Sequence, residues 1–290
     1  MSPDRAGYPP LFTMRKTNSL PGLFCKISGV GPVTLVVVTC GTQFDITMAN
    51  LKSLVAFSRA HLRLLLFSDA DNIQHLQDTL REWPASVLER VTYEMRLVRP
   101  PKSLAGPENC TFQRLFMPRL LSEEDGVLYV DSDAVFFHPV EDLWNYFGQM
   151  NDQQLAVVFS DVEDEALTIY NEWEMPHYKR YGINAGVMLM NLTRMRNSGL
   201  DALLLSWMDK YHHKVLDFHD QDIINTVFHH HPEKVFHGPC KWNFVHLVCL
   251  SNISCRGETP ALVHGTYQTF SDSYRVPAYR AIGKAMQQVS

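Results

Sequence analysis

The chain has 290 residues, of which 46% are apolar and 20% charged, and its formal net charge is −5. This composition is typical of a globular protein and excludes a disordered or fibrous chain. The negative charge argues against DNA or RNA as a partner, because nucleic-acid binding relies on Lys and Arg side chains at the phosphates.

The N-terminal part of the chain predicts an irregular segment followed by a β-α-β unit. Residues 1–30 are rich in Pro and Gly and show no sustained period. The run "VTLVVVTCG" at 33–41 is nearly continuous β-branched sequence ended by Gly, which predicts a strand buried on both faces of a parallel sheet. A helical pattern over 47–58 and a second strand that breaks into an acidic turn within 62–71 follow.

The alternation of elements continues and indicates one α/β domain over residues 31–290. The expected elements are a helix at 72–83, a strand at 91–99, a helix at 110–121, a strand at 127–130, apolar runs at 154–161 and 186–192, helices at 202–213 and 220–231, and a loop-rich tail. Alternating strands and helices with short connections predict a mostly parallel central sheet flanked by helices.

Two acidic residues follow the strand at 127–130. In extended backbone Asp131 and Asp133 project to the same side, while Ser132 faces away from them. They are expected at the carboxyl end of a strand, where open α/β sheets bind their ligands. Two carboxylates suit Mg²⁺ or Mn²⁺. The alternative is a polar turn in which the aspartates cap backbone amides.

Three further stretches carry polar groups suited to a site. "NAG" at 184–186 precedes an apolar run, and its small residues permit close approach of a ligand to the backbone. "HDQDIIN" at 219–225 predicts a helix start with Asp220 or Asp222 as N-cap and Gln221 in the first turn. His264 ends an apolar stretch, and an imidazole beside two carboxylates would favour Mn²⁺ over Mg²⁺.

Taken in order, "VVVTCG", "QRLFMP", "LYVDSD…HPVEDLW", "GINAGVMLMNLTRMR", "HDQDIIN", "PCKWNF" and "LVHG" resemble the glycosyltransferase family 8 enzymes. The resemblance extends over residues 33–282 and implies the GT-A nucleotide-sugar-binding fold. Within the family the chain is most similar to the glucoside xylosyltransferases. The implied reaction is the α-1,3 transfer of xylose from UDP-xylose to O-linked glucose on the EGF repeats of Notch-type receptors, with retention.

The resemblance also implies roles for individual residues. Asp131, Asp133 and His264 would hold Mn²⁺ against the UDP diphosphate. Gln221 with Asp220 would stabilise positive charge during front-face transfer, and Asn184 would hold sugar hydroxyls. The donor-binding set would comprise Thr39, Cys40, Gly41, Arg114, Asp131, Ser132, Asp133, Asp161, Ala185, Gly186 and Gly265, with the first three forming the uridine pocket. Arg114 could instead form a helix-surface ion pair, and Asp161 could cap a helix.

One departure from the family pattern concerns phosphate neutralisation. The wider family ends in His-x-x-Gly-x-x-Lys-Pro-Trp, whose Lys contacts the diphosphate. Here Gly265 directly follows His264, and no Lys occurs in the next ten residues. Some xylosyl members share this shortened form. Arg275 or Lys241 would be the substitutes.

Other functions share parts of this pattern. A related transferase would use UDP-glucose, UDP-galactose or UDP-glucuronate with the same frame. A nucleotide-sugar-binding protein without turnover would keep the pocket but release no UDP. A metal-dependent phosphohydrolase also uses clustered aspartates, and would need no sugar acceptor.

Cysteines and glycosylation sequons point to the secretory pathway. Six cysteines accompany sequons at Asn109, Asn191 and Asn252. The cysteines at 240, 249 and 255 favour local disulfides, although buried thiols are the alternative. We therefore expect a lumenal endoplasmic reticulum or Golgi enzyme, anchored as a type II membrane protein at full length. The anchor itself is absent here, since no stretch reaches the roughly 18 apolar residues that cross a bilayer.

Overall fold

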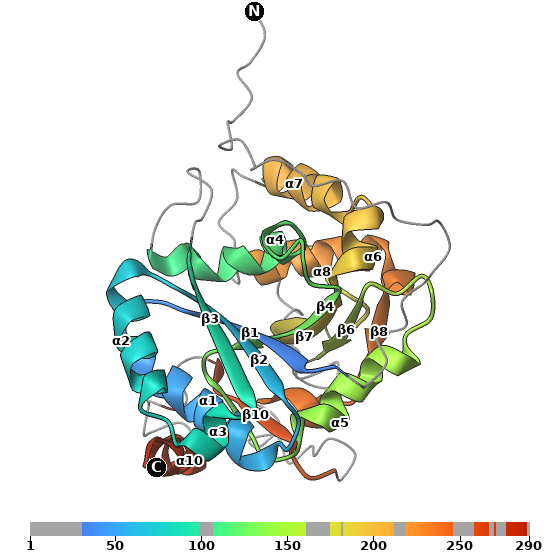
Figure 1. The fold of residues 1–290 in the computed structure, drawn as a ribbon. Coiled ribbons are helices and arrows are strands. Elements are labelled where there is room, and N and C mark those ends of the chain that lie inside the picture. The colour runs from blue at the N-terminus through green and yellow to red at the C-terminus, as the bar shows by residue number, and fades with distance from the viewer. Residues whose placement is uncertain are drawn as a thin grey trace, which may run out of the picture.

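The computed structural model describes residues 31–98, 107–160, 175–180, 182–211, 219–245, 258–266, 270 and 277–288. Its centre is a seven-stranded sheet of order β3-β2-β1-β4-β7-β6-β8 (Figure 1). The strands are β1 (Val33–Thr39), β2 (Leu62–Ser68), β3 (Val91–Leu97), β4 (Gly126–Asp131), β6 (Ala156–Phe159), β7 (Asn184–Asn191) and β8 (Val235–His237). The strands expected from the sequence lie within one or two residues of these bounds.

Most strand pairs are parallel, as predicted. β1 pairs parallel with both β2 and β4, β2 with β3, and β6 with β8. β7 runs antiparallel to both of its neighbours, β4 and β6. Every residue of β7 is buried, so its apolar run is explained by cover on both faces of the sheet.

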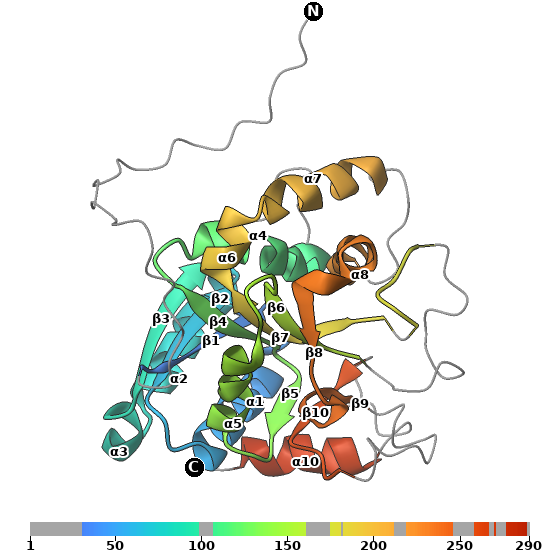
Figure 2. The same ribbon diagram turned by 90° about the vertical axis from the view of Figure 1, so that its right-hand side faces the viewer.

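Helices cover both faces of the sheet (Figure 2). One face packs against α1 (Phe44–Phe57), α2 (Ala70–Arg81), α3 (Ala85–Leu88) and α5 (Val140–Trp144). The other packs against α4 (Gln113–Leu120), α6 (Leu192–Asn197), α7 (Leu200–Tyr211) and α8 (Asp220–His230). The short helices η3 (Asn145–Gln149) and η6 (Pro232–Lys234) follow α5 and α8. This three-layer arrangement is the α/β architecture that the alternating sequence pattern predicted.

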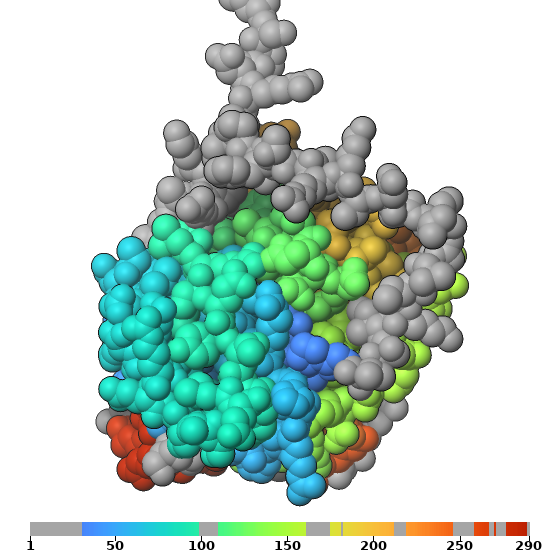
Figure 3. Space-filling view, viewed as in Figure 1, coloured from blue at the N-terminus to red at the C-terminus, as the bar shows by residue number. Residues whose placement is uncertain are grey.

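Strand β1 shows how one sequence run supplies both cores. Leu35 and Val37 belong to the cluster under α1, whereas Val36 and Val38 belong to the cluster under α4 and α8. Successive side chains of a strand point to opposite faces, so an unbroken apolar run is required where both faces are covered. At the edge of the sheet, α2 and β3 form the continuous blue-green surface in Figure 3, and β3 is only partly buried.

A second, three-stranded sheet has the order β5-β10-β9, with β5 at Ala134–Phe136, β10 at Leu262–His264 and β9 at Phe244–Val245. β5 begins three residues after β4 ends, and β10 pairs antiparallel with it. The C-terminal third of the chain is thereby brought beside the turn that follows β4.

Several boundaries differ from the sequence-based prediction. The single helix expected at 110–121 is a 3₁₀ segment, η2 (Pro107–Phe112), followed by α4, since short 3₁₀ turns commonly precede α-helices. The tail is not wholly loop, because α10 (Pro277–Gln287) packs against α1. Within the described parts of the chain, no helix combines the length and apolar character needed to span a membrane.

Candidate active site

The two aspartates lie at the carboxyl end of a central strand. Asp131 is the last residue of β4, and Asp133 lies in the short turn between β4 and β5. Their side chains are about a quarter exposed, at 24% and 27%. β4 is flanked by β1 and β7, so both carboxylates open towards the middle of the sheet edge. This is the placement that the sequence predicted for a ligand site.

Strand pairing brings His264 to these carboxylates. In the small sheet His264 is opposite Ala134, and the Gly265 N–H donates to the Asp133 carbonyl oxygen at 2.7 Å. The His264 Nε2 atom lies 3.3 Å from Asp133 Oδ1 and 3.6 Å from Asp131 Oδ2. The predicted convergence of two aspartates and a distant histidine is therefore present in the structure.

The three side chains suit a divalent cation. One ligand atom from each lies within 4.8 Å of the others. Ligands at right angles around an ion, each roughly 2.1 Å from it, are about 3 Å apart, and wider angles give larger separations. The spacing is therefore compatible with one ion, and a mixed carboxylate and imidazole set suits a transition metal such as Mn²⁺.

Gly186 leaves room for this group. A Cβ atom at Gly186 would lie 2.1 Å from His264 Cε1 and 2.8 Å from Asp131 Oδ2, both well inside van der Waals contact. Neither atom could stay in place if residue 186 carried a side chain. The glycine of the "NAG" stretch therefore serves the cluster itself, through the absence of a side chain.

Charge pairing sets the protonation of the group in the protein without metal. Burial alone would lower the pKa of His264, but the facing Asp133 and Asp131 carboxylates outweigh it and raise the pKa to about 10. Burial would raise the pKa of Asp131, but Arg114 and His264 hold it well below its ordinary value. Without a metal the group therefore holds an imidazolium beside at least one carboxylate.

Arg114 lies in the interior beside the acidic pair, with an exposed fraction of 4%. Its Nε donates to Asp220 Oδ2 at 2.7 Å, and its guanidinium also donates to Asp131 Oδ1 at 3.4 Å and to the Ala185 carbonyl oxygen. The alternative of a helix-surface ion pair is therefore wrong. Tyr129, which the sequence analysis missed, lies under the guanidinium at 4.8 Å and donates to Asp131 Oδ1 at 2.9 Å.

The start of α8 is next to β7. Gln221 Oε1 accepts from the Ala185 N–H at 2.8 Å, so Gln221 contacts the "NAG" stretch directly. Asp220 is 1% exposed and is the first helical residue. The expectation that Asp220 or Asp222 is the N-cap is wrong, because His219 is at that position, with φ of 54° and no side-chain capping bond.

Asn184, the first residue of β7, is oriented by the protein itself. Its Oδ1 accepts from the Gly186 N–H at 2.9 Å and from Asn243 Nδ2 at 3.0 Å. Asn243 in turn contacts His264 Nδ1 through Oδ1 at 2.9 Å. Nothing in the sequence analysis singled out Asn243. Its signal was the "KWN" stretch directly before an apolar segment. Contact of Asn184 with a sugar stays a prediction.

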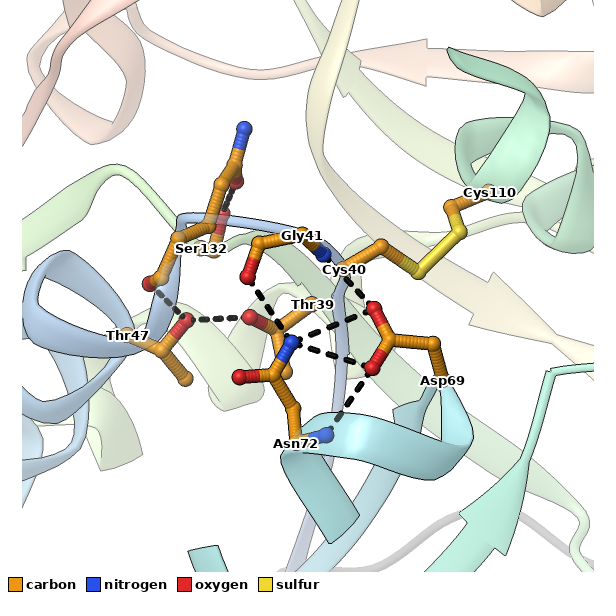
Figure 4. The surroundings of a disulfide bond; sticks show 9 residues. Thr39, Cys40, Gly41, Thr47, Asp69, Asn72, Cys110 and Ser132 are labelled. Atoms are coloured by element: carbon orange, nitrogen blue, oxygen red, sulfur yellow. Dashed lines mark hydrogen bonds between the residues drawn. A yellow bond between two sulfur atoms is a disulfide. The ribbon is translucent and has the colours of Figure 1, made fainter. Parts of the chain in front are cut away.

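The loop after β1 is held by hydrogen bonds from α2 (Figure 4). Gly41 has φ of +62°, a conformation that glycine adopts without strain. Its N–H donates to Asp69 Oδ2 at 2.6 Å, and its carbonyl oxygen accepts from Asn72 Nδ2 at 2.8 Å. The hydroxyl of Thr39 accepts from Thr47 at 2.7 Å. These contacts predefine the backbone of the predicted uridine pocket.

A disulfide between Cys40 and Cys110 joins this loop to η2 (Figure 4). Cys110 lies four residues before Arg114, so the bridge connects the end of β1 to the segment that carries the buried guanidinium. Cys240 is also disulfide-bonded. The alternative of six reduced thiols is therefore wrong.

Other predicted site residues have more peripheral positions. Ser132 is buried and donates to Gln43 Oε1, next to the N-terminus of α1. Lys241, a suggested substitute for the missing phosphate-binding lysine, lies 3.7 Å from the Glu258 carboxylate. Asp161 and Arg275 lie outside the described residues.

Comparison with known proteins places this site in a family. The model of Glycosyl transferase family 8 matches residues 48–267. Mouse glucoside xylosyltransferase 1 is 34% identical over 88% of this chain and 67% of its own length. Mouse glucoside xylosyltransferase 2 is 32% identical over 92% of this chain and 65% of its own length. The chain thus spans about two thirds of the curated relatives that it matches.

Solved structures confirm the fold. Apo mouse xyloside xylosyltransferase 1 superposes with a TM-score of 0.63 at 19% identity, covering 82% of this chain and 99% of that one. The galactosyltransferase LgtC, solved with donor and acceptor sugar analogues, gives a TM-score of 0.63 at 16% identity, covering 89% and 98%. The predicted GT-A architecture is therefore confirmed.

Proposed function

The chain belongs to glycosyltransferase family 8, and on that premise we propose that it transfers xylose from UDP-xylose to O-linked glucose on EGF repeats, forming an α-1,3 linkage. The observation that carries the proposal is the convergence of Asp131, Asp133 and His264 at the carboxyl end of β4. The similarity to glucoside xylosyltransferases over most of the chain supports xylose as the sugar and O-linked glucose as its acceptor.

The metal would be Mn²⁺, held by Asp131, Asp133 and His264. When bound, it supplies Lewis-acid stabilisation of the charge that develops on the departing UDP. The imidazole nitrogen among the ligands favours Mn²⁺ over Mg²⁺. The surrounding protein contributes orientation: Tyr129 and Arg114 hold Asp131, and the Gly265 N–H holds the Asp133 backbone.

The donor would lie across the carboxyl ends of β1 and β4. Thr39, Cys40 and Gly41 would line the uridine pocket, whose backbone is already held by α2 and by the disulfide. Arg114 would supply positive potential near the diphosphate and the sugar, although its Nε donates to Asp220. Lys241 is paired with Glu258, which leaves Arg114 as the described cation with direct contact to the acidic group.

Retention would proceed by front-face transfer. A double displacement needs a carboxylate nucleophile below the sugar, and the position that the family resemblance assigns to this role is Gln221, an amide. Asp220 is sealed in its pair with Arg114 and offers no open carboxylate. We therefore assign to Gln221 the electrostatic stabilisation of an oxocarbenium-like state, and to Asp220 the orientation of Arg114.

The compartment would be the lumen of the secretory pathway. The Cys40–Cys110 bridge is a bond that persists in oxidising compartments, and the chain also carries three glycosylation sequons. A glycoprotein acceptor would meet the enzyme there. A type II membrane anchor in the full-length protein is part of the same proposal.

A donor comparison tests the function. The purified chain would be incubated with Mn²⁺, an O-glucosylated EGF module and UDP-xylose, UDP-glucose, UDP-galactose or UDP-glucuronate in turn. We expect xylose transfer to dominate and to require the glucose on the module. Preference for another donor would replace the sugar assignment, and background UDP release with all four would indicate a binding protein. Phosphate release from simple esters without an acceptor would indicate a hydrolase.

A further inference from the structure

A line of buried hydrogen bonds extends from the backbone of β7 to the far side of the His264 ring. The Gly186 N–H donates to Asn184 Oδ1 at 2.9 Å, and Asn243 Nδ2 donates to the same oxygen at 3.0 Å. Asn243 Oδ1 lies 2.9 Å from His264 Nδ1. Asn184, Asn243 and His264 are exposed by only 5%, 0% and 3%. The predicted metal ligands account for only the last of these three residues.

The direction of every bond in this line follows from its first member. The oxygen and nitrogen of an Asn side chain, and the tautomer of a His, have to be assigned from the hydrogen-bond network. A backbone N–H is always a donor, so the Asn184 atom facing Gly186 must be its oxygen. The Asn243 atom facing that oxygen must then be its NH₂ group, which turns Oδ1 of Asn243 towards His264.

An amide oxygen only accepts, so the ring nitrogen facing it must carry a proton. With the proton on Nδ1 of His264, the lone pair of the neutral ring lies on Nε2. That nitrogen is the one beside the carboxylates, 3.3 Å from Asp133 Oδ1. The network thus selects the tautomer that a metal ligand needs at this position.

We propose that Asn243 is a positioning residue for the metal site, which holds the His264 ring with its proton on Nδ1 and presents Nε2 to the cation. The inference rests on the metal site of the proposed function. Metal-binding histidines usually donate their other ring N–H to an oxygen of the protein, and loss of that partner lowers metal affinity. Here the acceptor is a neutral amide whose own orientation is set from the strand opposite.

The backbone places Asn243 where this role requires it. Asn243 ends the 3₁₀ segment η7 (Cys240–Asn243), directly before β9. β9 pairs parallel with β10, with Val245 opposite His264. Asn184 begins β7, on the other side of the site. The line therefore joins both sheets, so that the ring is oriented by elements of regular structure and not by a loop.

The first test measures metal affinity directly, by electron paramagnetic resonance of free Mn²⁺ during titration. We expect Asn243→Ala to lower Mn²⁺ affinity about 10- to 100-fold, the usual effect of losing such a partner. Asn243→Asp keeps an acceptor for the Nδ1 proton and should stay within about fivefold of the unchanged protein. The matched control is Asn191→Ala, at the other end of β7, where the side chain caps α6. It should leave Mn²⁺ affinity unchanged.

A double-mutant cycle separates positioning from general structural support. If Asn243 acts through the ring, Asn243→Ala should have almost no further effect on Mn²⁺ affinity in a His264→Ala background. An equal loss in both backgrounds would overturn the proposal, as would wild-type affinity in Asn243→Ala alone. The thermal unfolding midpoint of each variant shows which proteins are folded.

A measurement on the unsubstituted chain needs no variant to fold. In ¹⁵N-histidine-labelled protein loaded with diamagnetic Mg²⁺ and UDP, the His264 signal should show a protonated Nδ1 and an unprotonated Nε2. Comparison with His264→Gln identifies the signal. The opposite tautomer overturns the proposal even if transfer is normal. A chain that binds no metal at all overturns it together with the metal assignment, whereas failure of xylose transfer alone leaves it standing.

Discussion

Nε2 of His264 lies 3.3 Å from Oδ1 of Asp133, although the two residues come from different thirds of the chain. The contact is made by strand pairing, because β10 aligns His264 with Ala134, the residue next to Asp133. A ligand set built on paired strands is held by backbone hydrogen bonds as well as by side-chain packing. We therefore expect single substitutions within the set to remove function while leaving the fold in place.

Asp133→Asn tests the metal assignment. The substitution keeps the shape of the side chain but removes its charge, so transfer activity should fall by more than about 100-fold because the ion loses a carboxylate ligand. The thermal unfolding midpoint should stay close to that of the unchanged protein. Asp142→Asn, on the exposed side of α5, is the control and should retain full activity. Near-normal transfer by Asp133→Asn would remove Asp133 from the site.

Gly186→Ala tests the close packing around the cluster. The added Cβ would lie 2.1 Å from His264 Cε1, so the ring must move and Mn²⁺ affinity should fall at least about tenfold. Gly148→Ala is a matched control, because a Cβ there meets no atom within 4 Å. Equal metal affinity in the two variants, measured by calorimetric titration, would contradict the arrangement described for His264.

Gln221→Ala tests the assignment of the amide to the chemical step. If its contact strengthens mainly in the transition state, kcat should fall by about 10- to 100-fold while KM for the donor changes little. Initial rates over a range of UDP-xylose concentrations separate the two parameters. Gln74→Ala, on the exposed surface of α2, should change neither. An effect confined to KM would assign Gln221 to donor binding.

Removal of the Cys40–Cys110 bridge should loosen the loop after β1. Replacing both cysteines with Ser should lower the free energy of unfolding by about 2–4 kcal/mol, since the bridge closes a long loop in the unfolded chain. UDP affinity should fall as well, because Gly41 is next to Cys40 in the predicted uridine pocket. Denaturant unfolding and UDP titration measure the two effects. Dithiothreitol should weaken UDP binding by the unchanged protein more than by the double variant.

The fold was largely predictable from the sequence because its signals are local. An unbroken apolar run such as 33–39 has few solutions other than a strand covered on both faces. Asp131 and Asp133 were likewise predictable as neighbours, since their separation of two residues fixes their common direction. The bounds of helices were less accurate at α4 and α10, where a 3₁₀ turn and an amphipathic tail carry weaker signals.

The interior contacts of the site were not predictable in the same way. That Arg114 is buried between two carboxylates depends on the approach of α4 to α8, which no local pattern encodes. The role of Gly186 became visible only when His264 was placed above it. Asn243 is an ordinary polar residue in sequence, and its significance comes from two partners distant in the chain.

Metal binding should strengthen with pH. In the metal-free protein the carboxylates raise the pKa of His264 to about 10, above its unfolded value of 6.5. The stabilisation from this imidazolium is therefore fully present below pH 6.5 and is lost as the pH rises through about 10. A metal must displace the Nε2 proton, so binding near pH 7 should release about one proton, and affinity should rise about tenfold per pH unit. Calorimetric titration of Mn²⁺ in buffers of different ionisation enthalpy counts the released protons. His264→Gln should abolish the release, and proton release that persists in this variant would show that another group titrates with the metal.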